Sequence, residues 1–504
     1  MREHQNMNHQ NLSKNYERNL QKNMEKKNKT SSNFKVNHPF GHHVANAQIT
    51  VNSDNPYFGT DQLGNTVFIN HNKKYGFLND SSVRYLLKGT EEMLRPQPGQ
   101  EVLASLRNVD VTYGSGSKAF RAIKDLSLNI YKGEVLGLVG ESGSGKSTTG
   151  KALVGLIPYS YGQIKLLDQT LPQKQLKRGL KFGKKLEEYK KLENFMVNKV
   201  QMIFQDPANS LNPHINVESV VSEGLENTKN ARIIYMYNIE QNSIIETYKL
   251  IDQEAKKTVF TKKYYDYLFS KIGKLNEEGY QAVYEEFLDK LKSHNQEEAV
   301  AFLSKEKEFR DQEGQKSERE CKKALVRDVL KSVGLDNSVL RRYPLEFSGG
   351  QQQRIGISRS VVLRPQLLVA DEPISALDVS IQAQVVNIFN ELKEKLNLTI
   401  LFIAHDLRMV EYISDRIAVM NKGTLLEIGK TEEIINHSLH PYTKSLLDAV
   451  PSIDSNKGSL IGYVYNPAMH KYDAQNQPEW VKINDDHFVL GTPKEVENWK
   501  KGIY

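Results

Sequence analysis

Cysteine is almost absent from the chain, since Cys321 is the only one among 504 residues. An intramolecular disulfide is therefore excluded, and so is a zinc or iron–sulfur site built from several cysteines. Cys321 lies in the charged stretch QKSERECKKAL, where we expect an ordinary surface thiol. This cysteine usage fits a protein that works in a reducing, cytosolic setting.

Long apolar runs are also missing. No window approaches the roughly 18 to 20 apolar residues of a membrane-spanning helix, and the first residues lack the apolar centre of a signal peptide. We therefore expect a soluble chain that is not exported. Most of the chain also lacks an excess of charge of one sign. The formal net charge is +7, and residues 1–50 carry +5 of it, from eight Lys/Arg against three Asp/Glu.

Composition divides the chain into four parts. Residues 1–45 are rich in Asn, Gln, Lys and His, which predicts a disordered basic arm. Residues 46–101 alternate short β-like pieces with turns, which indicates an appendage of unknown role. From 102 to 439 strand-like and helix-like pieces alternate, which predicts an α/β domain, and 440–504 form a C-terminal extension. Within the domain, about 228–318 has apolar residues at helical spacing and is predicted to be a helical insertion.

The strongest local signal is GESGSGKST at 140–148, directly after the apolar run at 135–139. This G-x-x-x-x-G-K-[ST] pattern predicts a loop whose backbone N–H groups surround a polyphosphate, followed by the positive end of a helix. Lys146 would supply a charge for the β- and γ-phosphate oxygens, and Ser147 a hydroxyl for Mg²⁺. The ATP-binding residues predicted here are Gly140, Glu141, Ser142, Gly143, Ser144, Gly145, Lys146, Ser147 and Thr148.

Three polar side chains are predicted to stand at the ends of buried strands near this loop. LLVADEP puts Asp371 at the end of an apolar strand, where an acid is costly unless it meets a cation, so Asp371 is expected to hold Mg²⁺ through a water. Glu372 is placed to polarise the water that attacks the γ-phosphate, a role worth about 10² to 10⁴ in rate. His405 follows the apolar run TILFIA and is assigned to the γ-phosphate.

Two further residues complete the predicted site. Gln205 ends the strand-like VQMIFQ, where its amide can reach Mg²⁺ and the attacking water, and residues 206–213 are expected to form a loop facing a partner. Tyr113 lies about 27 residues before Gly140 at the end of a predicted strand. We expect its ring to stack on adenine, a contact worth roughly 1 to 3 kcal/mol. Phe120 is the competing candidate for this contact.

A second glycine motif, FSGGQQQR at 347–354, precedes a helix predicted to begin near Gln351. It offers N–H groups and a helix dipole to an anion, although the chain already has its own phosphate loop. The motif makes physical sense if it closes on nucleotide held by another subunit, with two ATP molecules between two domains. The residues predicted to act in trans are Ser348, Gly349, Gly350 and Gln351.

Together, GESGSGKST, Gln205, FSGGQ, LLVADEP, SALD at 375–378 and His405 resemble the nucleotide-binding subunits of ABC transporters. FQDPANSLNP and HPYTKSLLDAVPSID at 440–454 are similar to the oligopeptide/dipeptide importer subgroup, and SALDVSIQAQVVN most resembles its F-type subunit. The resemblance covers roughly 102–225 and 322–455. It implies a P-loop NTPase core of ABC type with an antiparallel β subdomain and a helical subdomain, bound ATP and Mg²⁺, and Asp378 as a further residue acting in trans.

The resemblance also implies partners and a function. It implies ATP hydrolysis that powers oligopeptide uptake, by a heterodimer with a sister ATPase beneath two permease subunits at the cytoplasmic face of the membrane. An external solute-binding protein would take part indirectly, and no nucleic acid is expected. In the implied cycle ATP closes the dimer, and the loop after Gln205 transmits closure to a permease helix. The cargo stays open, because dipeptides, nickel and other solutes recur among relatives.

Other interpretations are weaker. A soluble cassette protein acting on nucleic acid or ribosomes would use the basic arm as a contact, but such proteins usually carry two cassettes or a long coiled coil, and this sequence shows one cassette without sustained heptads. A plain P-loop kinase or GTPase has no use for FSGGQ. Phe347 stands where many cassettes have Leu, and the C-terminal region lacks the cysteine cluster of some subgroup members.

Overall fold

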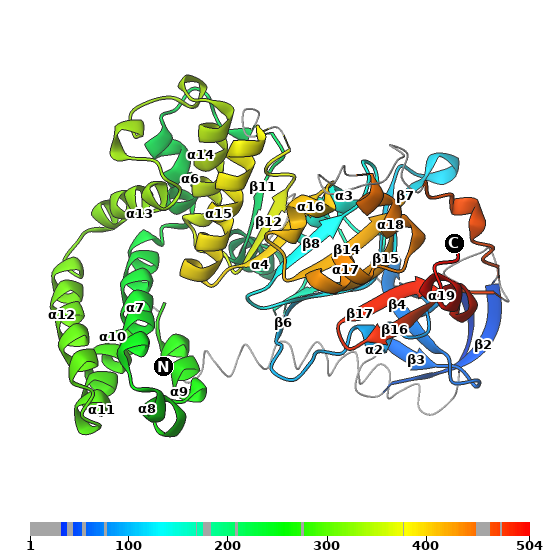
Figure 1. The fold of residues 1–504 in the computed structure, drawn as a ribbon, viewed down its shortest axis with the longest axis horizontal. Helices are drawn as coiled ribbons and strands as arrows, with labels where there is room; N and C mark the ends of the chain where they lie inside the picture. Colours follow the sequence, from blue (N-terminus) through cyan, green and yellow to red (C-terminus); the bar gives the residue numbers. More distant parts are fainter. Residues whose placement is uncertain are drawn as a thin grey trace.

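The computed structural model describes residues 32–37, 44–52, 57–74, 78–167, 169–174, 183–206, 210–273, 277–375, 377–449, 464–473 and 476–504. Figure 1 shows an elongated molecule with helices of the green segment at one end and the blue N-terminal strands at the other. The main sheet and its covering helices lie between them.

The main sheet has eight strands. In spatial order they are β11 (Val200–Ile203), β12 (Leu367–Asp371), β13 (Thr399–Ala404), β8 (Val135–Val139), β14 (Arg416–Asn421), β15 (Thr424–Lys430), β17 (His487–Gly491) and β16 (Glu479–Asn484). The first five are parallel and the last three pairings are antiparallel. Strands β8, β12 and β13 are buried throughout, as parallel strands covered on both faces must be, and they are apolar except for Asp371 at the end of β12 and Thr399 at the start of β13. The predicted α/β core is confirmed.

A second, four-stranded antiparallel sheet precedes the phosphate loop. Its order is β10 (Gln169–Thr170), β9 (Tyr161–Leu166), β6 (Val102–Tyr113) and β7 (Phe120–Tyr131). Its inward side chains pack with those of one face of the main sheet in a single core. This sheet is the antiparallel β subdomain that the resemblance implied.

Helices cover the main sheet and build the helical subdomain. The longer ones are α3 (Lys146–Leu153), α4 (Lys184–Lys199), α6 (Val217–Thr228), α7 (Ala231–Leu250), α12 (Glu297–Glu313), α13 (Glu318–Ser332), α14 (Gly349–Val361) and α15 (Val379–Leu396). Cys321 lies on α13, where it is fully buried with Leu325 and Val329. The expected surface thiol is therefore wrong, because spacing by four residues puts Cys321 on the apolar face of its helix despite its charged neighbours in sequence.

The segment in which we expected a helical insertion forms a small bundle with a core of its own. Between α7 and α12 it contains α8 (Gln253–Thr258), α9 (Lys262–Lys271), α10 (Glu278–Gln281), the π-helical turn η2 (Ala282–Phe287) and α11 (Leu288–Ser293). Tyr284, Phe287 and Leu303 lie in this core, separate from that of the main domain. Helix α7 belongs to both, because its first half packs on α13 and its second half on α12.

The N-terminal strands close into a barrel. They are β1 (Ser32–Asn37), β2 (Val44–Val51), β3 (Phe58–Thr60), β4 (Thr66–Lys74) and β5 (Leu78–Tyr85). The expected disordered arm at 1–45 is wrong for residues 32–37 and 44–45, which pair in this barrel, while residues 1–31 lie outside the described residues. Val36 is fully buried beside Ile49 and Val83, so partners distant in sequence compensate for the polar composition of the segment.

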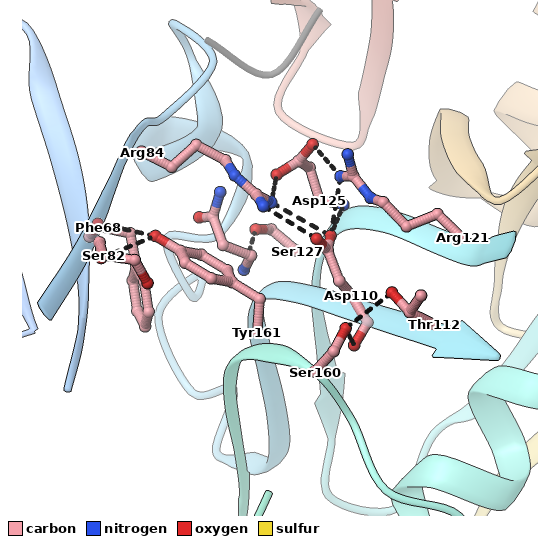
Figure 2. A network of polar contacts seen from close by, with 11 residues as sticks. Phe68, Ser82, Arg84, Asp110, Thr112, Arg121, Asp125, Ser127, Ser160 and Tyr161 are labelled. Atoms are coloured by element: carbon pink, nitrogen blue, oxygen red, sulfur yellow. Dashed lines mark hydrogen bonds and ion pairs between the residues drawn. The ribbon is translucent and has the colours of Figure 1, made fainter. Parts of the chain in front are cut away.

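The barrel is attached to the β subdomain through buried charges (Figure 2). Arg84 of β5 donates to both carboxylate oxygens of Asp110, at 3.1 and 2.9 Å, and also pairs with Asp125. Its guanidinium lies 4.0 Å from the ring centroid of Tyr161, whose hydroxyl donates to the carbonyl oxygen of Phe68. Charged and polar groups buried on both sides of the contact are thereby satisfied together.

The C-terminal extension continues the main sheet. It contains α18 (Pro441–Asp448), the short turn η5 (Pro467–Met469), strands β16 and β17, and α19 (Pro493–Lys500), and it follows α17 (Thr431–His437). Strand β17 pairs with β15, so the extension supplies the last two strands of the sheet. In the part of the chain that the structure describes, the helices are too short or too polar to cross a bilayer.

Candidate functional site

The loop at 140–148 joins the buried strand β8 to α3. Gly140 has φ 155°, and a Cβ built there would stand 2.0 Å from the carbonyl oxygen of Met420. Gly145 has φ 103° and precedes α3, whose first residue is Lys146. These backbone conformations are accessible to glycine without strain, so the loop can wrap tightly at the N-terminal end of the helix.

Lys146 is buried, with 4% of its surface exposed. Its Nζ donates to the carbonyl oxygens of Gly140 at 2.7 Å and Glu141 at 2.9 Å. Burial lowers the pKa of Lys146, and the carboxylates of Glu372 and Asp371 oppose this effect. The ammonium is thus held at the mouth of the loop by two backbone carbonyl oxygens.

The carboxylate predicted for Mg²⁺ meets the loop directly. The Ser147 hydroxyl donates to Oδ1 of Asp371 over 2.6 Å, which joins the start of α3 to the end of β12. Asp371 is 3% exposed, and burial raises its pKa, while the bond from Ser147 acts in the opposite direction. A buried carboxylate beside a hydroxyl is an oxygen set of the kind that Mg²⁺ prefers.

Gln205, Glu372 and His405 come together at the ends of three neighbouring strands. The Gln205 amide Nε2 donates to Oε2 of Glu372 over 3.0 Å, and Nδ1 of His405 lies 3.8 Å from the same oxygen. Glu372 has φ 46°, and its N–H donates to the carbonyl oxygen of Ile403 in β13. This turn at the strand end aims the carboxylate between an amide and an imidazole, and the imidazole remains more than half exposed.

Tyr113 lies beside the loop at the end of β6. Its side chain is partly exposed, and its hydroxyl is 3.5 Å from Oγ1 of Thr148. The other loop residues named from the sequence, Glu141, Ser142 and Gly143, surround the same turn between β8 and α3. The structure therefore brings together every residue that the sequence assigned to nucleotide in this chain.

The residues assigned to a partner's nucleotide form a separate exposed segment. Ser348 caps α14, and its N–H donates to Oε1 of Gln351 in a capping box. The helix begins at Gly349 rather than near Gln351 as predicted, because this cap forms two residues earlier. Asp378 precedes α15 and is exposed, while Phe347 is buried in the core. Residues 207–209 of the expected partner-facing loop, and residue 376, lie outside the described residues.

One contact was missed from the sequence. The backbone N–H of Glu141 donates to the hydroxyl oxygen of Tyr442 over 2.9 Å, although 301 residues separate them. Tyr442 lies in HPYTKSLL, which we used only as a sign of the subgroup. No local pattern pairs this tyrosine with the phosphate loop, since only the packing of α18 brings them together.

Comparisons with known proteins agree with this architecture. The model described as ABC transporter matches residues 123–375, and that described as oligopeptide/dipeptide transporter, C-terminal region, matches residues 426–472. The dipeptide transport ATP-binding protein DppF of Lactococcus lactis is 38% identical, over 79% of this chain and 97% of its own length. The oligopeptide transport ATP-binding protein OppF of Bacillus subtilis is 35% identical, over 79% of this chain and 98% of its own.

Among solved structures, a dimeric ATP-binding cassette bound to ADP and Pi is 20% identical with a TM-score of 0.41, over 65% of this chain and 98% of that one. The relatives above are matched over almost their whole length. From these matches and from the site's geometry, this chain belongs to the ATP-binding proteins of the ABC transporter family, in the group that carries the oligopeptide/dipeptide transporter C-terminal region.

Proposed function

We propose that this chain hydrolyses ATP with Glu372 as the residue that polarises the attacking water. The observation that carries the proposal is the meeting of Gln205 and His405 on one carboxylate oxygen of Glu372, next to the loop of Lys146. Gln205 orients the carboxylate and the water, and His405 contacts the γ-phosphate. Backbone N–H groups of residues 140–148 and the ammonium of Lys146 bind the phosphates.

The residues present also fit a magnesium ion bound together with ATP. Ser147 and Asp371 offer oxygen ligands at the site, Asp371 through a water, and Gln205 adds an amide oxygen. Burial of Asp371 is costly for its ionised form, and a cation would offset that cost. Magnesium, when bound, neutralises phosphate charge during hydrolysis.

The exposed segment of Ser348, Gly349, Gly350 and Gln351, together with Asp378, would complete the nucleotide site of a second subunit. Two observations support this assignment: the first turn of α14 contains no acidic residue, and the N–H groups at a helix N-terminus suit an anion. The second subunit is a sister ATPase, which makes the working unit a heterodimer. Two membrane permease subunits bind this pair at the cytoplasmic face of the membrane, where the chain is peripheral.

Oligopeptides are the cargo that we propose. The names of the relatives mention oligopeptide or dipeptide transport, and the C-terminal model carries the same description. Import would then involve an external solute-binding protein that this chain does not touch. The alternative of a soluble cassette acting on nucleic acid or ribosomes finds no support among these relatives.

Two substitutions test the ATPase assignment. Lys146→Ala should abolish measurable ATP binding, because the ammonium that meets the phosphates is lost. Glu372→Gln should retain ATP binding and lower the hydrolysis rate about 10²- to 10⁴-fold, since its amide can still accept the bond from Gln205. Parental hydrolysis by the Glu372→Gln chain would contradict the assignment, and Glu391→Gln, on the exposed face of α15, is the control.

Partners and cargo need a separate experiment. Affinity purification of the tagged full chain from membranes of the cells that naturally produce it should recover a second ATPase and permease subunits. Peptides should stimulate ATP hydrolysis by the reconstituted assembly in the presence of its solute-binding protein. Recovery of ribosomes or DNA in place of permeases would contradict the transport function. Stimulation by a different solute alone would contradict only the proposed cargo.

A further inference from the structure

Tyr442 connects the C-terminal extension to the nucleotide loop. It is the second residue of α18, it is 1% exposed, and its hydroxyl oxygen accepts the N–H of Glu141 over 2.9 Å. Burial raises the pKa of the hydroxyl to about 12, so it stays neutral at physiological pH. The extension therefore reaches the loop with one fixed polar atom.

The bond acts on the peptide group that holds Lys146. The N–H of Glu141 and the carbonyl of Gly140 belong to one planar unit, so the orientation of one sets that of the other. Lys146 Nζ donates to this carbonyl oxygen over 2.7 Å, on the opposite side of the unit from Tyr442. Because glycine leaves the backbone free to rotate, the plane needs a contact to hold it, and Tyr442 provides one.

Tyr442 is itself held by a buried polar network. Its N–H donates to Nδ1 of His440, the N-cap of α18, over 3.1 Å. The carboxylate of Glu427 accepts the N–H of Leu439 at 2.7 Å and that of His440 at 3.3 Å. Nε2 of His487 lies 2.8 Å from the same carboxylate, and both side chains are fully buried. The network fixes the start of α18 to β15 and β17, so the hydroxyl has little freedom to move.

We propose that Tyr442 is a positioning residue of the ATP site: its hydroxyl fixes the peptide group between Gly140 and Glu141 and thereby places the ammonium of Lys146 for the phosphates. The inference rests on the proposed ATP binding at residues 140–148. It makes the C-terminal extension a working part of the nucleotide site, in addition to its place at the edge of the sheet. Displacing α18 would loosen the loop without any change in the loop's own residues.

The direct test is Tyr442→Phe in the full chain, with calorimetric titration of ATP–Mg²⁺ and steady-state hydrolysis. Loss of one buried hydrogen bond predicts a Kd and KM for ATP raised about five- to tenfold, with kcat within about twofold, because the loop binds ground state and transition state alike. Tyr159→Phe is the matched control, since its buried hydroxyl donates to the carbonyl oxygen of Leu171 over 2.6 Å, away from the loop. The control should keep the parental Kd even where it lowers the melting temperature.

A second variant approaches the contact from the loop. Glu141→Pro removes the N–H donor and leaves α18 intact. Proline needs a negative φ, and Glu141 is not among the residues with positive φ. If Tyr442 acts through this N–H, the Kd of the double variant for ATP should be no more than about twofold above that of whichever single variant binds more weakly. A Kd raised by the product of the two single effects would overturn the proposal. Should Tyr442→Phe fail to fold, the same proposal requires Glu141→Pro alone to raise the Kd.

Different results contradict the proposed function and the role of Tyr442. A parent chain that does not bind ATP, or a Lys146→Ala chain that binds as the parent does, contradicts the proposed function. If the parent chain binds ATP and Lys146→Ala does not, but Tyr442→Phe keeps the parental Kd, only the role of Tyr442 is contradicted. A lowered kcat with unchanged KM in Tyr442→Phe would also overturn that role, because it would place the hydroxyl in the chemical step.

Discussion

Tyr113 and Phe120 are register partners across the hairpin of β6 and β7. Directly opposed residues of an antiparallel pair project from the same face, so the two side chains share one face of the hairpin, and both are exposed, Tyr113 by 44% and Phe120 by 63%. The Tyr113 hydroxyl also lies 3.5 Å from Oγ1 of Thr148 in the loop. This contact favours Tyr113 as the residue that stacks on adenine.

Tyr113→Ala should therefore weaken ATP binding. Loss of a stacking contact of about 1 to 3 kcal/mol predicts a Kd raised roughly five- to 150-fold, with the effect much smaller for a triphosphate without a base. Phe120→Ala is the matched control and should stay within about twofold of the parent. A larger loss in Phe120→Ala than in Tyr113→Ala would reverse the assignment.

Asp371→Asn should raise the stability of the fold and remove the stimulation of ATP hydrolysis by Mg²⁺. Since burial raises the folded-state pKa of Asp371 above its unfolded value, the ionised form at pH 7 disfavours folding, and stability from this group is lost as pH rises through the folded pKa. Asparagine carries no charge and can still accept the Ser147 hydroxyl. We expect a higher melting temperature without nucleotide, and hydrolysis that Mg²⁺ no longer stimulates.

Melting temperatures of the parent and of Asp371→Asn, with and without Mg²⁺ and ATP, check this prediction. Titration of Mg²⁺ in the presence of ATP should stabilise the parent against heat more than the Asp371→Asn chain. A melting temperature for the variant below that of the parent, without ligands, would show that the carboxylate stabilises the fold and that the expected sign is wrong.

Arg84→Met should release the barrel from the β subdomain. It leaves Asp110 and Asp125 buried with Arg121 as their remaining cation, and breaking a buried ion pair typically costs about 3 to 5 kcal/mol. We expect faster proteolysis between residues 86 and 101 and a lower melting temperature. The control is Lys395→Met, since Lys395 pairs with Glu391 at the surface and should cost less than about 1 kcal/mol. If the parent and Arg84→Met were equally resistant to proteolysis, docking of the barrel through Arg84 would be contradicted.

His440→Asn should reduce the acid sensitivity of the fold. Burial lowers the folded-state pKa of His440 to about 3, with His470 acting in the same direction and Glu495 against it. The unfolded chain takes up the proton first as pH falls below about 6.5, so stability is lost from there toward pH 3, by about 2 kcal/mol at pH 5. Asparagine can accept the same N-cap bond and does not titrate.

Urea unfolding at pH 7.5 and pH 5.0 measures the effect. The free energy of unfolding should differ between the two pH values by about 2 kcal/mol less in His440→Asn than in the parent, although lost ring packing against Trp499 lowers stability at both. His437→Asn is the control, because His437 is exposed on α17. An unchanged pH dependence in His440→Asn would contradict a buried neutral ring.

The nucleotide site was accessible from the sequence because its parts are local. GESGSGKST needs only its own glycines and the start of α3, and Asp371, Glu372 and His405 each follow a short apolar strand. Parallel strands end at one edge of a sheet, so residues just past those strands meet in the fold. The N-terminal arm shows the opposite case, because composition concealed strands whose partners lie up to about 50 residues away.

The phosphate loop, the acids beside it and the family of the chain follow from the amino-acid sequence alone, because short-range patterns encode backbone turns and strand ends. Three features became visible only in the folded chain: Cys321 is buried, Arg84 joins the barrel to the β subdomain, and Tyr442 contacts Glu141. Those contacts depend on how whole elements pack against one another, and packing between segments hundreds of residues apart leaves no periodic signal along the chain.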